Sequence, residues 1–109
     1  MNKKSDILER LYSIIESRKG DNPEASYTAK LLTQGMPEIA RKVGEEAVET
    51  ITAALAGEDS QIVEESADLL YHLLILWAQK GITPEEVWNE LIRREGKSGI
   101  EEKSSRATN

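Results

Sequence analysis

The 109-residue chain has no cysteine, no phenylalanine and a single histidine. Without cysteine, disulfide scaffolds, cysteine-ligated zinc, iron–sulfur clusters and thiol catalysis are excluded. One histidine, His72, excludes histidine-rich metal sites and allows a Ser-His triad only if that residue serves in it. Any reactive chemistry in this chain must therefore rest mainly on other side chains.

Positive charge and long apolar runs are also scarce. Lys and Arg number 14 against 20 Asp and Glu, so the net charge is −6 and the isoelectric point is near 4.9. This balance argues against a nucleic-acid or membrane partner, since both need clustered positive charge. The longest apolar run, residues 73–78, is far below the roughly 20 residues that span a bilayer. Residues 1–9 are too polar for a signal peptide, so we expect a cytoplasmic protein.

Apolar residues recur with helical spacing, and Gly and Pro separate the helical segments. The pattern predicts helices at residues 5–18, 37–56, 60–80 and 83–96, with a short helical piece at 25–32. Strand-like alternation does not occur anywhere in the sequence. We therefore expect an all-α fold, a helical bundle of about five helices.

The helix expected at residues 60–80 is apolar over more than half of its circumference. Such a wide apolar arc requires burial on several sides. Five short helices in one layer cannot surround it, so we expect a homodimer that completes the bundle. The domain then spans residues 1–96, and the polar residues 97–109 form a tail that we expect to be mobile.

The acidity of the chain is concentrated in its middle. Between residues 38 and 68 there are nine acidic and two basic residues, a net of −7, whereas the remainder sums to +1. Glu45, Glu46 and Glu49 share one face of their predicted helix, at the border of its apolar stripe. This local excess of one charge requires a physical reason.

A second group of acids follows on the next predicted helix, where Glu65 and Asp68 lie beside the apolar arc. The short turn between the two helices forces them to run antiparallel, with Glu46 opposite Asp68 and Glu49 opposite Glu65. The predicted turn centre differs from this register by about three residues, roughly 4.5 Å of rise, which side chains can span. The carboxylates are therefore expected to converge.

Converging carboxylates repel one another by about 4 kcal/mol per pair at ~4 Å and an effective dielectric constant of ~20. Since a domain is stable by only ~5 to 15 kcal/mol, such a cluster must spread, take up protons or bind cations. An all-oxygen ligand set selects Mg²⁺ or Mn²⁺, and bound Mg²⁺ keeps positions open for phosphate oxygens. We therefore expect hydrolysis of a phosphoanhydride, although either half of the cluster alone also fits a solvated helix face.

The acidic segments EEAVE at residues 45–49 and ESAD at 65–68 resemble the EExxE and ExxD pattern of the all-α nucleotide pyrophosphohydrolase superfamily. SYTAKLL at 26–32, KVGEEAVE at 42–49 and ADLLYHLL at 67–74 are similar to the phosphoribosyl-ATP pyrophosphatase family of histidine biosynthesis. The similarity covers nearly the whole chain. It implies a homodimer, dependence on Mg²⁺, and conversion of phosphoribosyl-ATP to phosphoribosyl-AMP and pyrophosphate, the second step of that pathway.

On this basis we expect the acidic cluster to be the catalytic centre. The hypothesis is that Glu46, Glu49, Glu65 and Asp68 hold Mg²⁺, with Mn²⁺ as a possible substitute. Glu45 is expected to act as the general base for the attacking water or as a ligand to a second ion.

Polyanionic substrates also need cationic partners. Lys42 lies on the face of the acids, where it reaches a phosphate oxygen or pairs with Glu45 or Glu46. Other expected substrate contacts lie in or beside the loop after the first helix, although each also fits ordinary loop solvation or capping: Arg18, Lys19, Ser26, Tyr27, Thr28 and Lys30. Cations further along are expected to fold over bound substrate: Arg93, Arg94, Lys97 and Arg106.

The sequence leaves two further questions open. His72, four residues after Asp68, either orients that carboxylate by a hydrogen bond or is a buried histidine capped by a neighbour. Trp77 and Trp88 are most simply core or dimer contacts. Two rival functions are a housecleaning pyrophosphohydrolase acting on nucleoside triphosphates and a non-catalytic helical dimerisation module.

Overall fold

The computed structural model describes residues 4–107, and every regular element in that range is a helix. The helices are α1 (Ile7–Ser17), α2 (Tyr27–Gln34), α3 (Met36–Ala56), α4 (Asp59–Lys80), α5 (Pro84–Arg94) and α6 (Gly99–Ala107). The predicted all-α class is confirmed, with one short helix beyond the five expected. Of the described helices, none combines the length and the apolar character needed to cross a membrane.

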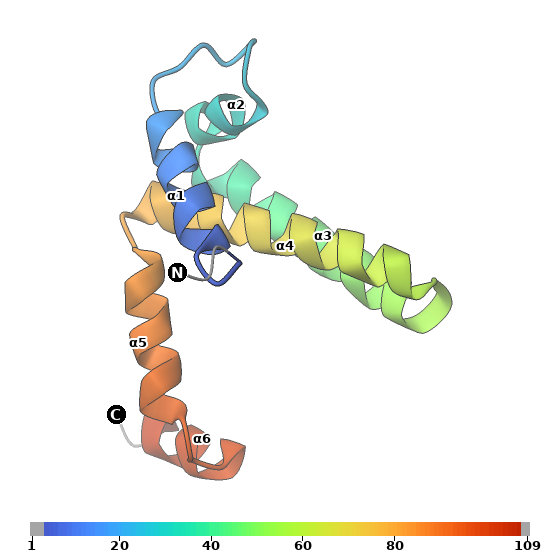
Figure 1. The fold of residues 1–109 in the computed structure, drawn as a ribbon, viewed down its shortest axis with the longest axis vertical. Helices are drawn as coiled ribbons and strands as arrows, with labels where there is room; N and C mark the ends of the chain where they lie inside the picture. Colours follow the sequence, from blue (N-terminus) through green and yellow to red (C-terminus); the bar gives the residue numbers. More distant parts are fainter. Residues whose placement is uncertain (1–3, 108–109) are drawn as a thin grey trace.

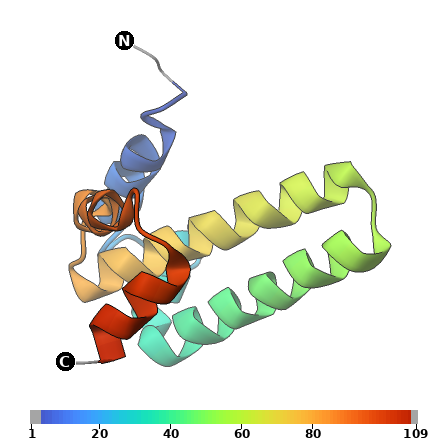
Figure 2. The ribbon, with the colours of Figure 1, turned by 90° about the horizontal axis from the view of Figure 1, so that it is seen from below.

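Helices α3 and α4 form a long antiparallel hairpin, which dominates the molecule (Figure 1). Their side-by-side course is clearest in Figure 2, where the turn between them lies at the far end from α1 and α2. Gly57 occupies this turn, and a Cβ atom there would lie 3.0 Å from the carbonyl oxygen of Ala53. A side chain at this position would crowd the end of α3, so glycine suits the tight turn, which sets which residues of the two helices face each other.

Local hydrogen bonds explain where the shorter helices begin. The Ser26 hydroxyl accepts a hydrogen bond from the backbone N–H of Ala29 at 3.1 Å and caps α2. A capping box opens α5, since Thr83 Oγ1 accepts from the Glu86 N–H at 3.3 Å and the Glu86 side chain accepts from the Thr83 N–H. Both helix starts follow from short-range sequence.

The hydrophobic core lies at one end of the hairpin, where α1 and α2 pack against it. Its buried residues are Ile15, Leu31, Ile39, Leu74, Ile75 and Ala78. Among the described residues, no further helix packs on the half of the hairpin nearest the turn (Figure 1). Apolar side chains of this half are exposed to solvent. Leu55 is 83% exposed and Val63 is 68% exposed. The fold thus positions the acidic residues at the border between a covered and an uncovered half of the hairpin.

Helix α5 leaves the body as an arm that contacts α1 (Figure 1). Trp88 donates a hydrogen bond to Glu9 and packs edge-on against Trp77, which in turn packs on the core. Helix α6 occupies residues 99–107 of the segment predicted as a mobile tail; mobility stays a prediction. Residues 108–109 of that tail and residues 1–3 of the predicted domain lie outside the described residues.

Candidate functional site

Glu46 is a carboxylate buried inside the α3–α4 hairpin. The residue is 6% exposed, and its Oε2 has no hydrogen-bond partner within the described residues. The ammonium group of Lys42 lies 3.7 Å from its Oε1. Because an ionised oxygen without a partner is costly to bury, this position favours a bound cation or a proton.

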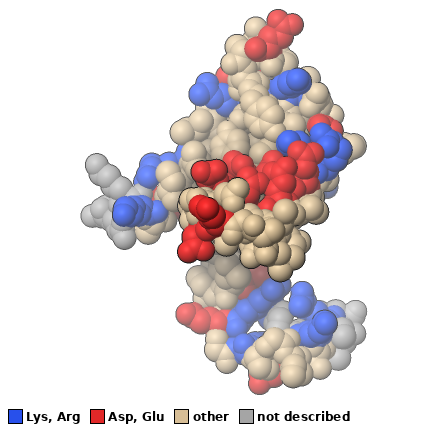
Figure 3. Space-filling model, turned by 90° about the vertical axis from the view of Figure 1, so that its right-hand side faces the viewer, with Lys and Arg blue, Asp and Glu red and all other residues tan. Residues whose placement is uncertain are grey.

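Four further carboxylates gather around Glu46. Oxygens of Glu46, Glu65 and Asp68 lie within 4.8 Å of one another, and oxygens of Glu45, Glu46 and Glu49 form a second group within the same limit. Figure 3 shows acidic side chains gathered on this face of the molecule. The convergence expected from the sequence is therefore present in the geometry, and Glu46 belongs to both groups.

The register of the hairpin is held by a residue that the sequence pattern did not single out. The Thr50 hydroxyl lies 2.8 Å from the carbonyl oxygen of Glu46 and 3.2 Å from the carbonyl oxygen of Glu65. Thr50 thus faces Glu65 across the hairpin, one residue from the predicted pairing of Glu49 with Glu65. The signal available in the sequence was its position four residues after Glu46, because a threonine hydroxyl in a helix often hydrogen-bonds the backbone carbonyl oxygen four residues earlier.

Two carboxyl groups at the α3–α4 contact, those of Glu46 and Glu65, have raised pKa values. The pKa of Glu46 is raised, first by burial and then by hydrogen bonding to Glu49 and by the charges of Glu49 and Asp68. Hydrogen bonding to Glu49, followed by burial and neighbouring negative charge, raises the pKa of Glu65 to about 7. These shifts reflect burial together with crowded carboxyl groups, an environment that disfavours the ionised form.

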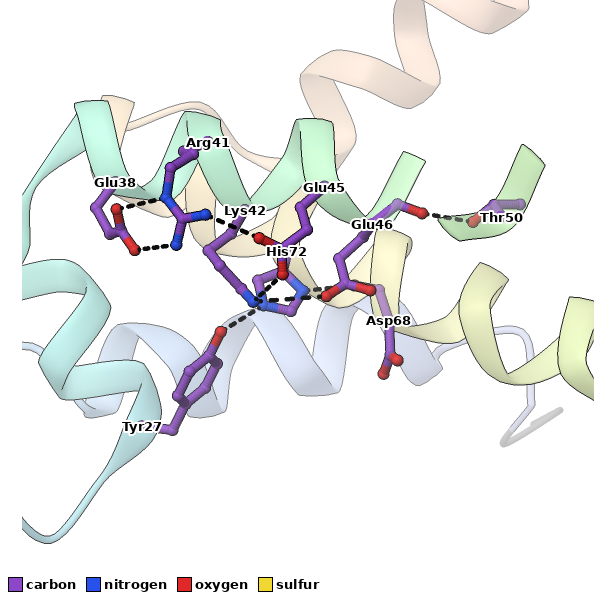
Figure 4. A network of polar contacts seen from close by, with 9 residues as sticks. All are labelled: Tyr27, Glu38, Arg41, Lys42, Glu45, Glu46, Thr50, Asp68 and His72. Carbon is purple, nitrogen blue, oxygen red and sulfur yellow. Dashed lines mark hydrogen bonds and ion pairs between the residues drawn. The ribbon is translucent and has the colours of Figure 1, made fainter. Parts of the chain in front are cut away.

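Glu45 lies in the opposite electrostatic environment. Its carboxylate accepts hydrogen bonds from Lys42 at 2.9 Å and from Arg41 at 2.8 Å, and these two cations lower its pKa. Arg41 also holds Glu38 through two hydrogen bonds of 2.7 and 2.9 Å (Figure 4). The sequence pattern did not single out Arg41, although it stands four residues before Glu45 at ion-pair spacing. The rim of the site therefore carries two cations beside a fully ionised carboxylate.

The predicted substrate residues fall in two places. Tyr27 stands at the start of α2 near Lys42, whose charge acts on its phenol, and burial raises the Tyr27 pKa. Tyr27 and Lys30 line an open cleft of about 590 Å³. Arg18 instead pairs with Asp21 at 3.8 Å. Tyr27 and Lys42 are thus the predicted contacts that the fold brings near the acids, and Lys30 lines the cleft beside Tyr27.

The side chain of Lys19 lies at the C-terminal end of α4. Its ammonium group donates to the carbonyl oxygen of Ala78 at 2.9 Å and pairs with Glu16 at 3.2 Å. In this position it stabilises the helix C-terminus, where a cation is favourable.

The lone histidine takes the capped arrangement. His72 is 6% exposed, and its Nδ1 lies 2.7 Å from the backbone carbonyl oxygen of Asp68 rather than from the carboxylate. Its Nε2 lies 2.8 Å from the Tyr27 hydroxyl (Figure 4). Of the two arrangements that the sequence left open, the structure has the capped histidine, because the preceding helical turn brings the carbonyl oxygen of Asp68 under Nδ1.

A second cleft, of about 390 Å³, lies between α3 and α4 toward the turn. It begins at two acids of the cluster and is lined by Glu49, Thr52, Ala53, Ala56, Gly57, Gln61, Glu64 and Glu65. The cations of the α5–α6 arm lie apart from the acidic patch in Figure 3, and Arg93 and Arg94 pair with Glu90 on their own helix. In this structure the clefts beside the acids are therefore open to solvent.

The raised pKa of Glu65 predicts how stability changes with pH in metal-free protein. Its folded pKa of about 7 exceeds the ordinary value of 4.5, so the folded state binds the proton more tightly. The stabilising contribution is fully present below pH 4.5 and is lost as the pH rises through about 7. We expect the unfolding temperature in EDTA to fall across this window, and the fall to be smaller in Glu65→Gln.

The matched control for this pH profile is Glu64→Gln, which changes an exposed acid next to Glu65. It should retain the wild-type dependence on pH. A Glu65→Gln profile that coincides with that of the wild type would contradict the electrostatic account.

Comparison with known proteins gives a consistent result. The family model described as "Phosphoribosyl-ATP pyrophosphohydrolase" matches residues 8–95. A protein named phosphoribosyl-ATP pyrophosphatase from Paramagnetospirillum magneticum is 60% identical over 103 residues, 94% of each chain. Proteins of the same name from Azospirillum brasilense and Trichlorobacter lovleyi are 55% and 51% identical, covering 92% and 97% of this chain and 90% and 98% of their own.

Proposed function

The chain belongs to the phosphoribosyl-ATP pyrophosphohydrolase family, and from this premise we propose that it hydrolyses phosphoribosyl-ATP to phosphoribosyl-AMP and pyrophosphate. We place this reaction at the second step of histidine biosynthesis. The observation that supports the proposal best is the buried, unpartnered Oε2 of Glu46 among four further carboxylates. Such a centre has little use in a protein that only dimerises.

The proposed cofactor is Mg²⁺, with Mn²⁺ as a substitute, and its proposed ligands are Glu46, Glu49, Glu65 and Asp68. The residues fit such an ion, because all the donors are carboxylate oxygens and one of them is buried without a partner. When bound, the ion supplies positive charge that polarises phosphate oxygens and lowers the pKa of a coordinated water. The same positive charge would offset the burial, the hydrogen bonding to Glu49 and the neighbouring negative charge that together raise the pKa values of Glu46 and Glu65.

The remaining charged residues have complementary roles in the proposal. Glu45 stays ionised beside Lys42 and Arg41, as it must to accept a proton from water or to hold a second ion. Substrate phosphates compete with Glu45 for these two cations, so substrate binding frees Glu45 and raises its affinity for a proton. The cleft beside Tyr27 and Lys30 offers room for the nucleoside part of the substrate.

We also propose that the protein is a homodimer. Helix α3 exposes Val48, Ile51 and Leu55 along one ridge, and α4 exposes Val63 and Leu70 along another. Ridges of this kind on a hairpin without a covering layer are typical of a bundle completed by a second copy. The cytoplasmic location, like the absence of nucleic-acid and membrane partners, stays a prediction.

The function is tested by measuring pyrophosphate release from phosphoribosyl-ATP with Mg²⁺ and with EDTA. We expect turnover that requires Mg²⁺, and turnover of dNTPs lower by on the order of 100-fold, since a site that hydrogen-bonds the second ribose discriminates strongly against ligands that lack it. Growth of a histidine auxotroph lacking this step should be restored by the gene.

Two outcomes would contradict the proposal. Preferential hydrolysis of dNTPs would favour a housecleaning pyrophosphohydrolase. No hydrolysis together with no rise in unfolding temperature on adding Mg²⁺ would favour a dimerisation module, because an ion that binds the folded state must stabilise it.

A further inference from the structure

A hydrogen-bonded chain links the acidic helix α4 to the start of α2. The backbone carbonyl oxygen of Asp68 lies 2.7 Å from Nδ1 of His72, and Nε2 of the same ring lies 2.8 Å from the Tyr27 hydroxyl. His72 is buried, whereas Tyr27 is 50% exposed beside the carboxylate cluster (Figure 4). This series of hydrogen bonds therefore runs from the interior of the hairpin to the surface of the site.

The directions of the two hydrogen bonds follow from the group at the inner end, the backbone carbonyl oxygen of Asp68. A carbonyl oxygen only accepts, so Nδ1 of His72 carries a proton and donates a hydrogen bond to the backbone carbonyl oxygen of Asp68. A neutral imidazole has a single N–H, which leaves Nε2 without a proton and able only to accept. When the ring is neutral, the Tyr27 hydroxyl is therefore the donor of the hydrogen bond to Nε2 of His72.

Donation to His72 determines what Tyr27 offers on its exposed side. When the hydroxyl hydrogen is engaged in the hydrogen bond to His72, the phenolic oxygen presents only lone pairs to the site. It then binds a hydrogen-bond donor. Phosphate oxygens are themselves acceptors, so they bind cations such as Lys42 instead. Lys42 is close enough to Tyr27 for its charge to act on the phenol. A sugar hydroxyl or a base amino group is the kind of partner that fits Tyr27.

We propose that His72 is a positioning residue that holds Tyr27 as a hydrogen-bond acceptor for a hydroxyl or amino group of the nucleoside part of the substrate. The assignment of the substrate rests on the proposed function, whereas the arrangement of protons does not. The neighbouring pair of Thr28 and Tyr71, joined at 2.5 Å between hydroxyls, bridges the same two helices and provides a matched control.

The arrangement of protons is tested without substrate. Because the chain contains one histidine, the long-range ¹H–¹⁵N spectrum of labelled protein at neutral to alkaline pH reports on His72 alone. We expect a protonated Nδ1 and an unprotonated Nε2, with a marked change of the Nε2 signal in Tyr27→Phe and little change in Tyr71→Phe. A proton on Nε2 would overturn the proposal. An Nε2 signal that is unchanged in Tyr27→Phe would overturn it as well.

The functional role is tested by a double-mutant cycle with Tyr27→Phe and His72→Asn. The Asn side chain is able to keep the donor toward the Asp68 carbonyl but does not reach Tyr27. We expect each variant to raise KM about two- to tenfold with little change in kcat, and the double variant to equal the single ones. His72→Gln, whose amide oxygen can take the place of Nε2, should recover part of the loss.

Additive effects on KM, or a loss confined to kcat, would overturn the positioning role. Tyr71→Phe should retain the wild-type KM, since it removes a hydroxyl from the same helix contact outside the site. If the wild type does not hydrolyse phosphoribosyl-ATP while its histidine spectrum is as expected, the proposed function fails and the arrangement of protons stands.

Discussion

The Glu46→Gln variant should release pyrophosphate from phosphoribosyl-ATP at least about 100-fold more slowly than the wild type. Removal of a residue that only supports a metal ligand lowers metal affinity or activity by about 10- to 100-fold. Glu46 belongs to both carboxylate groups, so its loss should lower activity further. Asp68→Asn should show a loss of the same order. The measurement is the initial rate of pyrophosphate release at saturating Mg²⁺.

The same substitution should raise stability when no metal is present. The pKa of Glu46 is raised in the folded state, so its ionised form opposes folding at pH values above that pKa. A neutral Gln removes this cost and can donate its amide to a neighbouring carboxylate. We expect Glu46→Gln to unfold a few degrees higher than the wild type in EDTA, and to lose most of the stabilisation by Mg²⁺.

A matched control for both measurements is Glu85→Gln, which neutralises an exposed acid at the start of α5. It should keep the wild-type rate and the wild-type response to Mg²⁺. Near-wild-type rates in Glu46→Gln or Asp68→Asn would falsify the ligand assignment, whatever the stability change.

The second large effect is expected from Ile51→Arg on the exposed ridge of α3. Ile51 is 57% exposed in the isolated chain, and a proposed partner copy covers it. Burying a guanidinium in an apolar interface without a carboxylate partner is strongly unfavourable. We expect the dimer dissociation constant to rise by on the order of 100-fold or more, measured by sedimentation velocity over a concentration series.

The control for the dimer is Gln34→Arg, which adds the same charge at an exposed polar position of α2. This variant should sediment as the wild type does, at twice the 12.2 kDa mass of the chain. A wild type that is monomeric at micromolar concentrations, or an Ile51→Arg variant that dimerises normally, would contradict the proposed interface.

The helices could be predicted because their determinants are local. Helical hydrogen bonds join residues four apart, and the caps at Ser26 and Thr83 involve partners three residues away. The facing of the acids could also be predicted, since a short turn between two helices makes them antiparallel, and the observed position of Thr50 opposite Glu65 differs by one residue from the predicted pairing of Glu49 with Glu65.

The surroundings of individual side chains were harder to predict. The spacing of His72 and Asp68 is the same whether the ring contacts the carboxylate or the carbonyl oxygen, and only the packed helix selects the carbonyl. Likewise, Lys19 lies next to the loop in sequence but reaches the end of α4, 59 residues away. Contacts of this range leave no periodic signal.

The sequence by itself therefore determined the helical class, the helix ends and the meeting of two acidic faces, because each depends on interactions within a few residues. Only the tertiary structure decided that Oε2 of Glu46 is buried without a hydrogen-bond partner among the described residues, that Glu45 is held by Arg41 and Lys42, and that the Tyr27 hydroxyl lies within hydrogen-bond distance of Nε2 of His72. The physical reason is that burial and hydrogen-bond partners depend on which distant surfaces pack together.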